Sequence, residues 1–168
     1  MQNAKDTFYL MLQQRLAALN PQRVIVLRGQ LRPGVLVGEN EAPTAHTPVN
    51  CFRLTWTTLS IDRTSAMPLA AMQCEIRYAT DGSRPMAAMD RGRLLSAMDS
   101  ELAAALARSP QSTPKLNCSA TDSGSAPTPM ATSIFWSQPV FAPLTATGER
   151  LERTATVDMF AFQEAGEA

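Results

Sequence analysis

Apolar and polar residues alternate over residues 71–79, and this period of two predicts a strand with one buried face. The buried face contains Met72, Cys74, Ile76 and Tyr78. Asp81 and Gly82 follow and end the strand. A strand of this kind needs a second element that covers its apolar face.

The hydrophobic period changes after Pro85. From Asp90 onward the large apolar residues recur three and four positions apart, which predicts an amphipathic helix that ends before Ser109 and Pro110. Its apolar stripe contains Leu94, Leu95, Met98, Leu102, Ala105 and Leu106. Because the strand and the helix each bury one side only, we expect the helix to lie across the sheet that contains the strand.

Another amphipathic helix is predicted near the start of the chain, with Asp6 close to its N-terminal cap and Asn20-Pro21 at its end. Its apolar stripe contains Phe8, Met11, Leu12, Leu16 and Leu19. Two short segments rich in β-branched residues follow, Val24–Leu27 and Val35–Val37. The first is predicted to be a buried strand, and a turn at residues 32–34 allows the two segments to pair as a hairpin.

A long strand is predicted to begin at Cys51, and its apolar residues change phase half-way along. These residues are Phe52, Leu54, Trp56, Leu59 and Ile61. One extra residue moves a strand from one phase to the other, so we predict a β-bulge near Thr57 and Thr58. The short connection through Pro68 favours antiparallel pairing with the strand at 72–78.

The segment 109–130 carries four prolines, one glycine and many hydroxyl residues. Leu116 and Met130 are its only large apolar residues, so it has too little apolar surface to offset the entropy of ordering by itself. We predict that it is an extended loop or arm, ordered only against a neighbouring molecule.

The last part of the chain is predicted to form strands. Residues 134–136 and Val140–Phe141 flank Pro139, which favours a broken or an edge strand because proline cannot donate to a central ladder. In the final strand, Ala155, Val157 and Met159 share one face, and Phe160 and Phe162 share the other. Together the elements predict an α+β fold in one domain over residues 1–168, with a mostly antiparallel sheet and two helices packed on one face.

Composition and charge narrow the classes of function. Basic and acidic residues number fifteen each, so the chain has no electrostatic footprint for a phosphate backbone, and sequence-specific nucleic-acid binding is not expected. No apolar run approaches the roughly 20 residues of a membrane-spanning helix. The first residues lack the basic and apolar regions of a secretory signal, so export by that route is not expected either.

Residues that could carry chemistry are few. The one catalytic arrangement that the composition permits is His46 as a base, with Cys51 or Cys118 as the nucleophile. A zinc site would have to unite His46 with Cys51, Cys74 and Cys118, although no two of them have the short spacing of structural sites. No glycine-rich segment has the spacing of a nucleotide site. We therefore predict no catalytic, metal or cofactor site.

Candidate contact residues are easier to name. Arg84, Arg91 and Arg93 lie near the start of the second helix, where they form either a contact patch for a neighbouring subunit or a solvated helix end of mixed charge. Leu116 and Met130 are the apolar anchors of the predicted arm. These five residues are the predicted contacts with other subunits or partners.

The order of elements resembles that of the tail terminator family of tailed bacteriophages and phage-like particles. The shared features are an N-terminal amphipathic helix before a strand region with Arg28-Gly29, long antiparallel strands, a strand-turn-helix unit and a C-terminal strand pair. The resemblance spans nearly the whole chain, and it rests on size and element order rather than on a signature motif.

The resemblance implies a structural virion protein without enzymatic activity or cofactor. Members of the family form a hexameric ring on the head-proximal end of the tail tube, end tube polymerisation and present a surface to the head-tail connector. The implied partners are further copies of the chain, the tail tube protein, connector proteins and, in a contractile tail, the sheath protein. The implied place of assembly is the cytoplasm of the bacterial host.

Three alternatives remain open. The first is another neck protein, such as a head-tail connector or stopper. The second is a small thiol hydrolase, and the third is a monomeric ligand-binding domain with a pocket between helix and sheet.

Overall fold

The computed structural model describes residues 1–38, 48–64, 66–119, 125–164 and 167. The helices within these ranges are α1 (Gln2–Leu19), the 3-10 helix η1 (Arg84–Met86) and α2 (Arg91–Ala107). The strands are β1 (Val24–Leu27), β2 (Gln30–Pro33), β3 (Val35–Val37), β4 (Phe52–Asp62), β5 (Leu69–Thr80), β6 (Ser112–Asn117), β7 (Thr128–Trp136), β8 (Val140–Phe141), β9 (Thr145–Thr147) and β10 (Arg150–Phe162).

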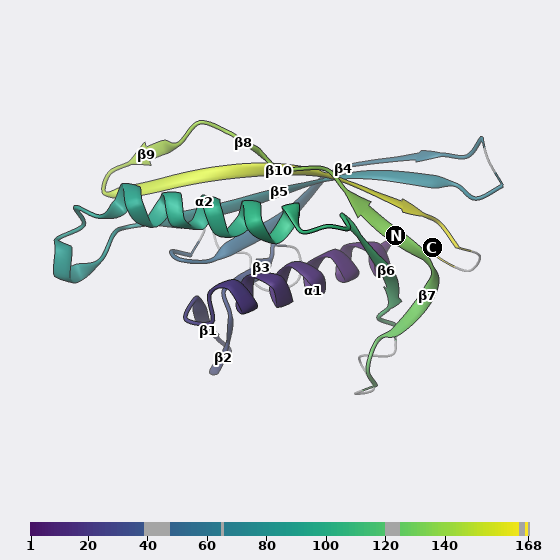
Figure 1. Ribbon diagram of the computed structural model, residues 1–168, viewed down its shortest axis with the longest axis horizontal. Helices are drawn as coiled ribbons and strands as arrows, with labels where there is room; N and C mark the ends of the chain where they lie inside the picture. Colours follow the sequence, from purple (N-terminus) through teal and green to yellow (C-terminus); the bar gives the residue numbers. More distant parts are fainter. Residues whose placement is uncertain (39–47, 65, 120–124, 165–166, 168) are drawn as a thin grey trace.

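Eight of these strands form one sheet in the order β3-β4-β5-β10-β7-β6, and β8 and β9 also pair with β10. Among its strands only β3 and β4 pair in parallel. Figure 1 shows both α-helices on the same side of the long strands, and β6 and β7 curling round to lie beside α1. The predicted α+β fold, a mostly antiparallel sheet with two helices on one face, is confirmed.

Burial follows the strand period in register across the three longest strands. Leu54, Ile76 and Ala155 are side by side on β4, β5 and β10, and all three are fully buried. The side chains of α2 that complete this layer are Leu95, Met98, Leu102, Ala105 and Leu106. The predicted strand and helix over residues 71–107 therefore pack as expected, by burying their apolar sides against each other.

The predicted bulge is also present. The register of β4 against β5 shifts between Trp56 and Thr58. The extra residue keeps Leu59 opposite Met72, on the side of the sheet that the helices cover. Leu59 lies beyond the part of β4 that pairs with β3, and it is 52% exposed there.

Helix α1 begins before the predicted cap. It starts at Gln2, and Asp6 lies within it, where its carboxylate accepts a hydrogen bond from the Gln2 side chain at 2.8 Å. Met1 and Ala4 are buried and extend the apolar stripe toward the N-terminus. Apolar packing, which adds to helix stability beyond any capping residue, accounts for the earlier start. Leu19 is half-exposed, so the buried stripe ends at Leu16.

The predicted hairpin between β1 and β3 is wrong. β1 pairs with β2 through a two-residue turn at Arg28 and Gly29, whose positive φ angles of 50° and 78° suit the twist of a tight hairpin. β3 instead joins the main sheet beside β4. The nearest extended segment after the turn therefore takes the pairing that Val35–Val37 was predicted to have.

The prediction of an unordered loop over residues 109–130 is wrong for β6 and the start of β7, which pair with each other. The outer edge of β6 is satisfied by side chains of α1. The backbone N–H of Leu116 donates to Thr7 Oγ1 at 2.9 Å, and that of Cys118 donates to Asn3 Oδ1 at 3.0 Å. An exposed strand edge is thereby closed within one chain, so its order does not require a neighbour.

The C-terminal strands match the sequence pattern. β7 and β8 both pair with β10 and are separated around Pro139, as expected of a broken strand. Ala155, Val157 and Met159 are fully buried, whereas Phe160 on the opposite face is 37% exposed. β7 is not an edge strand, however, because β6 lies beyond it.

Leu102 tests the helix-sheet contact. Leu102→Asp would bury a carboxylate at a fully buried position of α2, and we expect it to lower the free energy of unfolding by on the order of 4 kcal/mol. Ala104→Asp adds the same group at an exposed position of the same helix and should cost about 1 kcal/mol or less. Urea denaturation of both variants gives the comparison, and equal losses would contradict the assigned core face.

Candidate interaction surfaces

The five predicted contact residues lie in two separate parts of the molecule. Arg84 belongs to η1, and Arg91 and Arg93 belong to the first turn of α2. Leu116 and Met130 belong to the β6–β7 pair, near the other end of α2 in Figure 1. The 17 residues of α2 span about 25 Å, so the two groups do not form one site.

The corner between η1 and α2 carries mixed charge. Arg84 and Arg93 are exposed, whereas the Arg91 guanidinium donates a hydrogen bond to the carbonyl oxygen of Glu149. The Asp90 carboxylate accepts a hydrogen bond from the Ser83 backbone N–H at 2.9 Å, and bonding to Ser83 lowers the pKa of Asp90. This arrangement is compatible both with a contact patch and with a solvated helix end.

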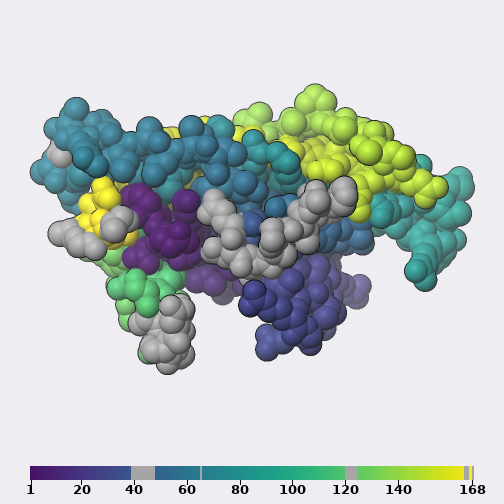
Figure 2. Space-filling view, turned by 180° about the vertical axis from the view of Figure 1, so that it is seen from behind, coloured from purple at the N-terminus to yellow at the C-terminus, as the bar shows by residue number. Residues whose placement is uncertain are grey.

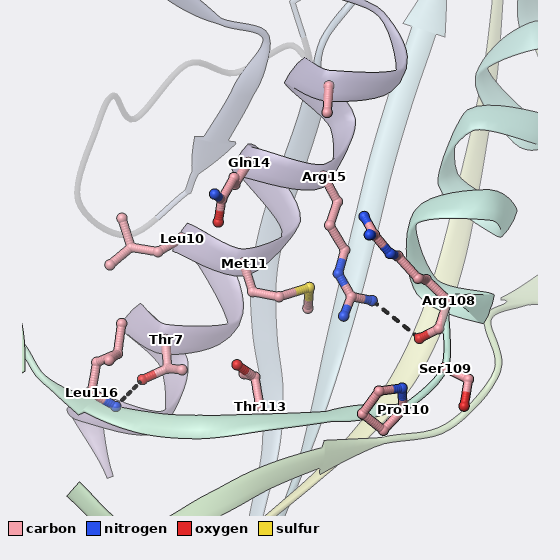
Figure 3. Close-up of a pocket in the computed structure, with 11 residues that line it drawn as sticks. Thr7, Leu10, Met11, Gln14, Arg15, Arg108, Ser109, Pro110, Thr113 and Leu116 are labelled. Carbon is pink, nitrogen blue, oxygen red and sulfur yellow. Dashed lines mark hydrogen bonds between the residues drawn. The ribbon is translucent and has the colours of Figure 1, made fainter. Parts of the chain in front are cut away.

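Leu116 lies in a groove between α1 and β6 with a volume of about 510 Å³. Figure 3 shows Leu10 and Met11 on one wall, and Thr113 and Leu116 on the β6 side. The Arg15 guanidinium lies at the end of the groove near α2 and donates to backbone carbonyls there. None of the described lining residues is a cysteine, a histidine or a carboxylate, so the groove offers packing and hydrogen bonds rather than a nucleophile or a base.

The thiols show little sign of activation. Cys51 is fully buried, and burial raises its pKa to about 11. Burial and the negative charge of Asp6 raise the pKa of Cys118. Because the thiolate is the reactive form, both shifts oppose nucleophilic chemistry near neutral pH. His46, the proposed base, lies outside the described residues.

The structure also bears on the zinc hypothesis. Within the described ranges, no three His, Cys, Asp or Glu side chains gather closely enough to hold a metal ion. Cys51 and Cys74 are buried in the body of the protein, and all three cysteines are free thiols.

The β1–β2 hairpin presents an apolar face that its sequence suggested would be buried. Val24, Val26 and Leu31 share one face of the hairpin and are 39%, 69% and 70% exposed. The hairpin is separate from the main sheet and projects from the body beyond the C-terminal end of α1 (Figure 1). An exposed apolar face of this kind is typical of a contact with another molecule.

A second unpredicted feature surrounds Lys115 on β6. Its side chain is completely buried, and its ammonium group lies 2.5 Å from the Glu167 carboxylate and 3.6 Å from that of Glu164. It also donates to the carbonyl oxygen of Phe162 at 2.7 Å. Thr132 on β7 donates to Glu164 through both its hydroxyl and its backbone N–H. One buried lysine thus ties the C-terminal segment to the β6–β7 pair.

These carboxylates line a pocket of about 550 Å³ at the base of the β4–β5 turn. The described lining residues are Ala66, Met67, Pro68, Gln163, Glu164 and Glu167. The backbone N–H of Gln163 donates to the carbonyl oxygen of Pro68 at 2.8 Å, which holds the C-terminal segment against that turn. We call this feature the carboxylate pocket.

Neither surface could be predicted from the sequence, for two different reasons. The segment Val24–Leu27 looks like a core strand because exposure cannot be read from a short apolar run. Lys115 is separated from Glu164 and Glu167 by about fifty positions, so no spacing in the sequence connects them. The acidic composition of the last residues was the only available signal.

Comparison with known proteins gives no family and no function for this chain. The chain matches no protein-family model and no curated protein. Among the described residues, no helix has the length and apolar character needed to cross a membrane.

Glu164 gives a pH test of the C-terminal attachment. Hydrogen bonds from Thr132, first from its side chain and then from its backbone, lower the pKa of Glu164 below its ordinary value of 4.5. The charged form is therefore favoured by folding, and its contribution is complete above pH 4.5 and is lost as the pH falls through the lowered pKa. Near neutral pH, the melting temperature of the native protein should be higher than that of the Glu164→Gln variant. The difference between the two melting temperatures should narrow below pH 4.5. A gap that stays constant with pH would contradict this role.

Proposed function

We propose that this protein is a structural subunit of a phage tail, which caps the head-proximal end of the tail tube, ends tube polymerisation and joins the tail to the head-tail connector. The proposal is based on the order of elements along the chain, which resembles that of the tail terminator family. Its main structural support is the β1–β2 hairpin, because one chain by itself leaves Val26 and Leu31 more than two-thirds exposed on a projecting element. Such a surface suits a protein that works within an assembly.

The distribution of the helices supports the same proposal. Both helices cover one face of the sheet, and the other face of β5 and β10 carries hydrophilic residues such as Glu75, Arg77 and Thr156. A subunit with a bare sheet face and projecting hairpins can contact different partners on different sides. In a ring, unlike surfaces of successive copies meet after a fixed rotation and close on themselves.

The proposed partners follow from this assignment. They are further copies of the chain, with six as the expected number, the tail tube protein, the head-tail connector proteins and, if the tail is contractile, the sheath protein. The proposed location is the neck of the virion, and no cofactor or catalytic step is part of the proposal. The raised thiol pKa values favour this assignment over a thiol hydrolase.

Assembly provides the direct test. We expect purified protein, alone or with the tube protein of the same phage, to form particles of about six times the 18.2 kDa subunit mass by mass photometry. Negative-stain images should show rings on one end of each tube, and tubes polymerised with the protein should be shorter than those polymerised without it.

Other outcomes would redirect the assignment. Rings that bind connector particles but leave tube length unchanged would identify another neck protein. A protein that stays monomeric at every concentration, with tubes present, would contradict the proposal. Ester or thioester turnover abolished by iodoacetamide would instead support a thiol hydrolase.

A further inference from the structure

We propose that the β1–β2 hairpin of one copy inserts Arg28 into the carboxylate pocket of the next copy, with Val26 and Leu31 packing on the apolar rim of that pocket. This inference rests on the proposed ring, and it names the two surfaces that meet between neighbouring subunits. Each surface is incomplete within a single chain.

The pocket carries more negative charge than its own chain balances. Glu164 and Glu167 face one ammonium group, that of Lys115, and none of the six described lining residues is a cation. The Glu167 side chain is 5% exposed, and its Oε1 atom is buried without a hydrogen-bond donor among the described atoms. A buried carboxylate oxygen without a donor is costly and calls for a compensating group. An incoming guanidinium supplies the missing charge, and its N–H groups can reach the partly exposed Glu164.

The hairpin supplies such a group. Arg28 is exposed at the turn, and its guanidinium has no hydrogen-bond or ion-pair partner in the described part of the chain. The strands behind it carry Val26 and Leu31, at 69% and 70% exposure, on one face. The rim of the pocket offers Ala66, which is exposed, and Met67, which is 43% exposed. The hairpin thus presents a cation beside apolar side chains, and the carboxylate pocket presents carboxylates beside apolar side chains, so the two surfaces are complementary.

The positions of the two surfaces require a second copy. The hairpin follows the C-terminal end of α1, whereas β6, which holds the pocket through Lys115, is bonded to Asn3 and Thr7 at the N-terminal end. The 18 residues of α1 separate these ends by about 27 Å. In Figure 2 the indigo hairpin projects from the lower middle of the molecule, well apart from the yellow C-terminal segment, which lies at the left beside the blue β4–β5 hairpin. Contacts between such unlike surfaces are heterologous, and they generate a ring when the rotation closes.

Cysteine crosslinking tests the contact while keeping Arg28. In a Cys118→Ser background, one batch carries Gln30→Cys beside the hairpin turn and a second carries Ala66→Cys on the pocket rim; both positions are exposed. With a short bis-maleimide, the mixed batches should give a dimer band and each batch alone should give none, because only unlike surfaces meet. Ser96→Cys, at an exposed position of α2, replaces Gln30→Cys as the matched control and should give no band with Ala66→Cys.

Charge reversal tests the role of the guanidinium. Adding Arg28→Glu to the Gln30→Cys batch should weaken the association at least about tenfold, and Arg28→Lys should retain most of it. The thermal stability of the isolated subunit should be unchanged by either substitution, since Arg28 has no partner within the described chain. The band and its loss with Arg28→Glu would support the contact.

Three results would overturn the inference. The first is a ring that forms without the mixed crosslink, which would leave the proposed function standing. The second is a crosslink indifferent to Arg28→Glu. The third is a protein that remains monomeric with and without tubes, which would remove both the contact and the ring.

Discussion

The carboxyl end of α2 is the point on which the packing of this fold depends. A helix leaves its last carbonyl groups without partners inside the helix, and here donors from three other segments supply them. Arg15 of α1 donates to the carbonyl of Ala105 at 2.9 Å, and the Trp136 indole of β7 donates to that of Leu106 at 3.0 Å. Gln111, between α2 and β6, also donates to Leu106. These bonds hold both helices and β7 in one arrangement, and losing Arg15 would remove the side-chain donor of the Ala105 carbonyl.

The aromatic core and the edge of the sheet follow from this arrangement. With α1 held beside β7, the Phe8 ring makes edge contacts with Trp136 and Trp56, at centroid distances of 6.1 and 5.8 Å. The same position of α1 lets Thr7 and Asn3 close the outer edge of β6. The order of β6 therefore depends on its hydrogen bonds to α1. The buried Lys115 of β6 in turn holds the C-terminal segment through its bonds to Phe162 and Glu167.

Charge is distributed unevenly between the interior and the projecting parts. A second internal network joins Tyr78 and Arg153 to the Asp99 carboxylate, at 2.5 and 2.6 Å, and links α2 to two strands. The carboxylate pocket, by contrast, holds two carboxylates around one lysine. In the Tyr78–Asp99–Arg153 network one carboxylate faces one guanidinium, whereas a group left one charge short is a natural place for a partner to bind. The unbalanced charge therefore favours a contact between copies at the C-terminal segment rather than beneath α2.

The sequence by itself determined the elements whose residues repeat with a clear period. The sequence predicted the strand at 72–78, the helix over Arg91–Ala107 and the bulge between Trp56 and Thr58. Each could be predicted because burial of one face makes apolar residues recur with the period of the strand or helix. The fold class followed from the order of these elements, since each needed another to cover its apolar side.

Only the tertiary structure decided which short segments pair and which charges meet. β1 took β2 as its partner and left Val26 exposed, although its composition is that of a core strand. β6, which lies in a segment poor in apolar residues, gained order from hydrogen bonds to α1 more than a hundred positions away. Lys115 and Glu167 met across 52 positions to form a buried ion pair. Such contacts join residues far apart in the chain and leave no local period, so their free energy becomes visible only once the chain is folded.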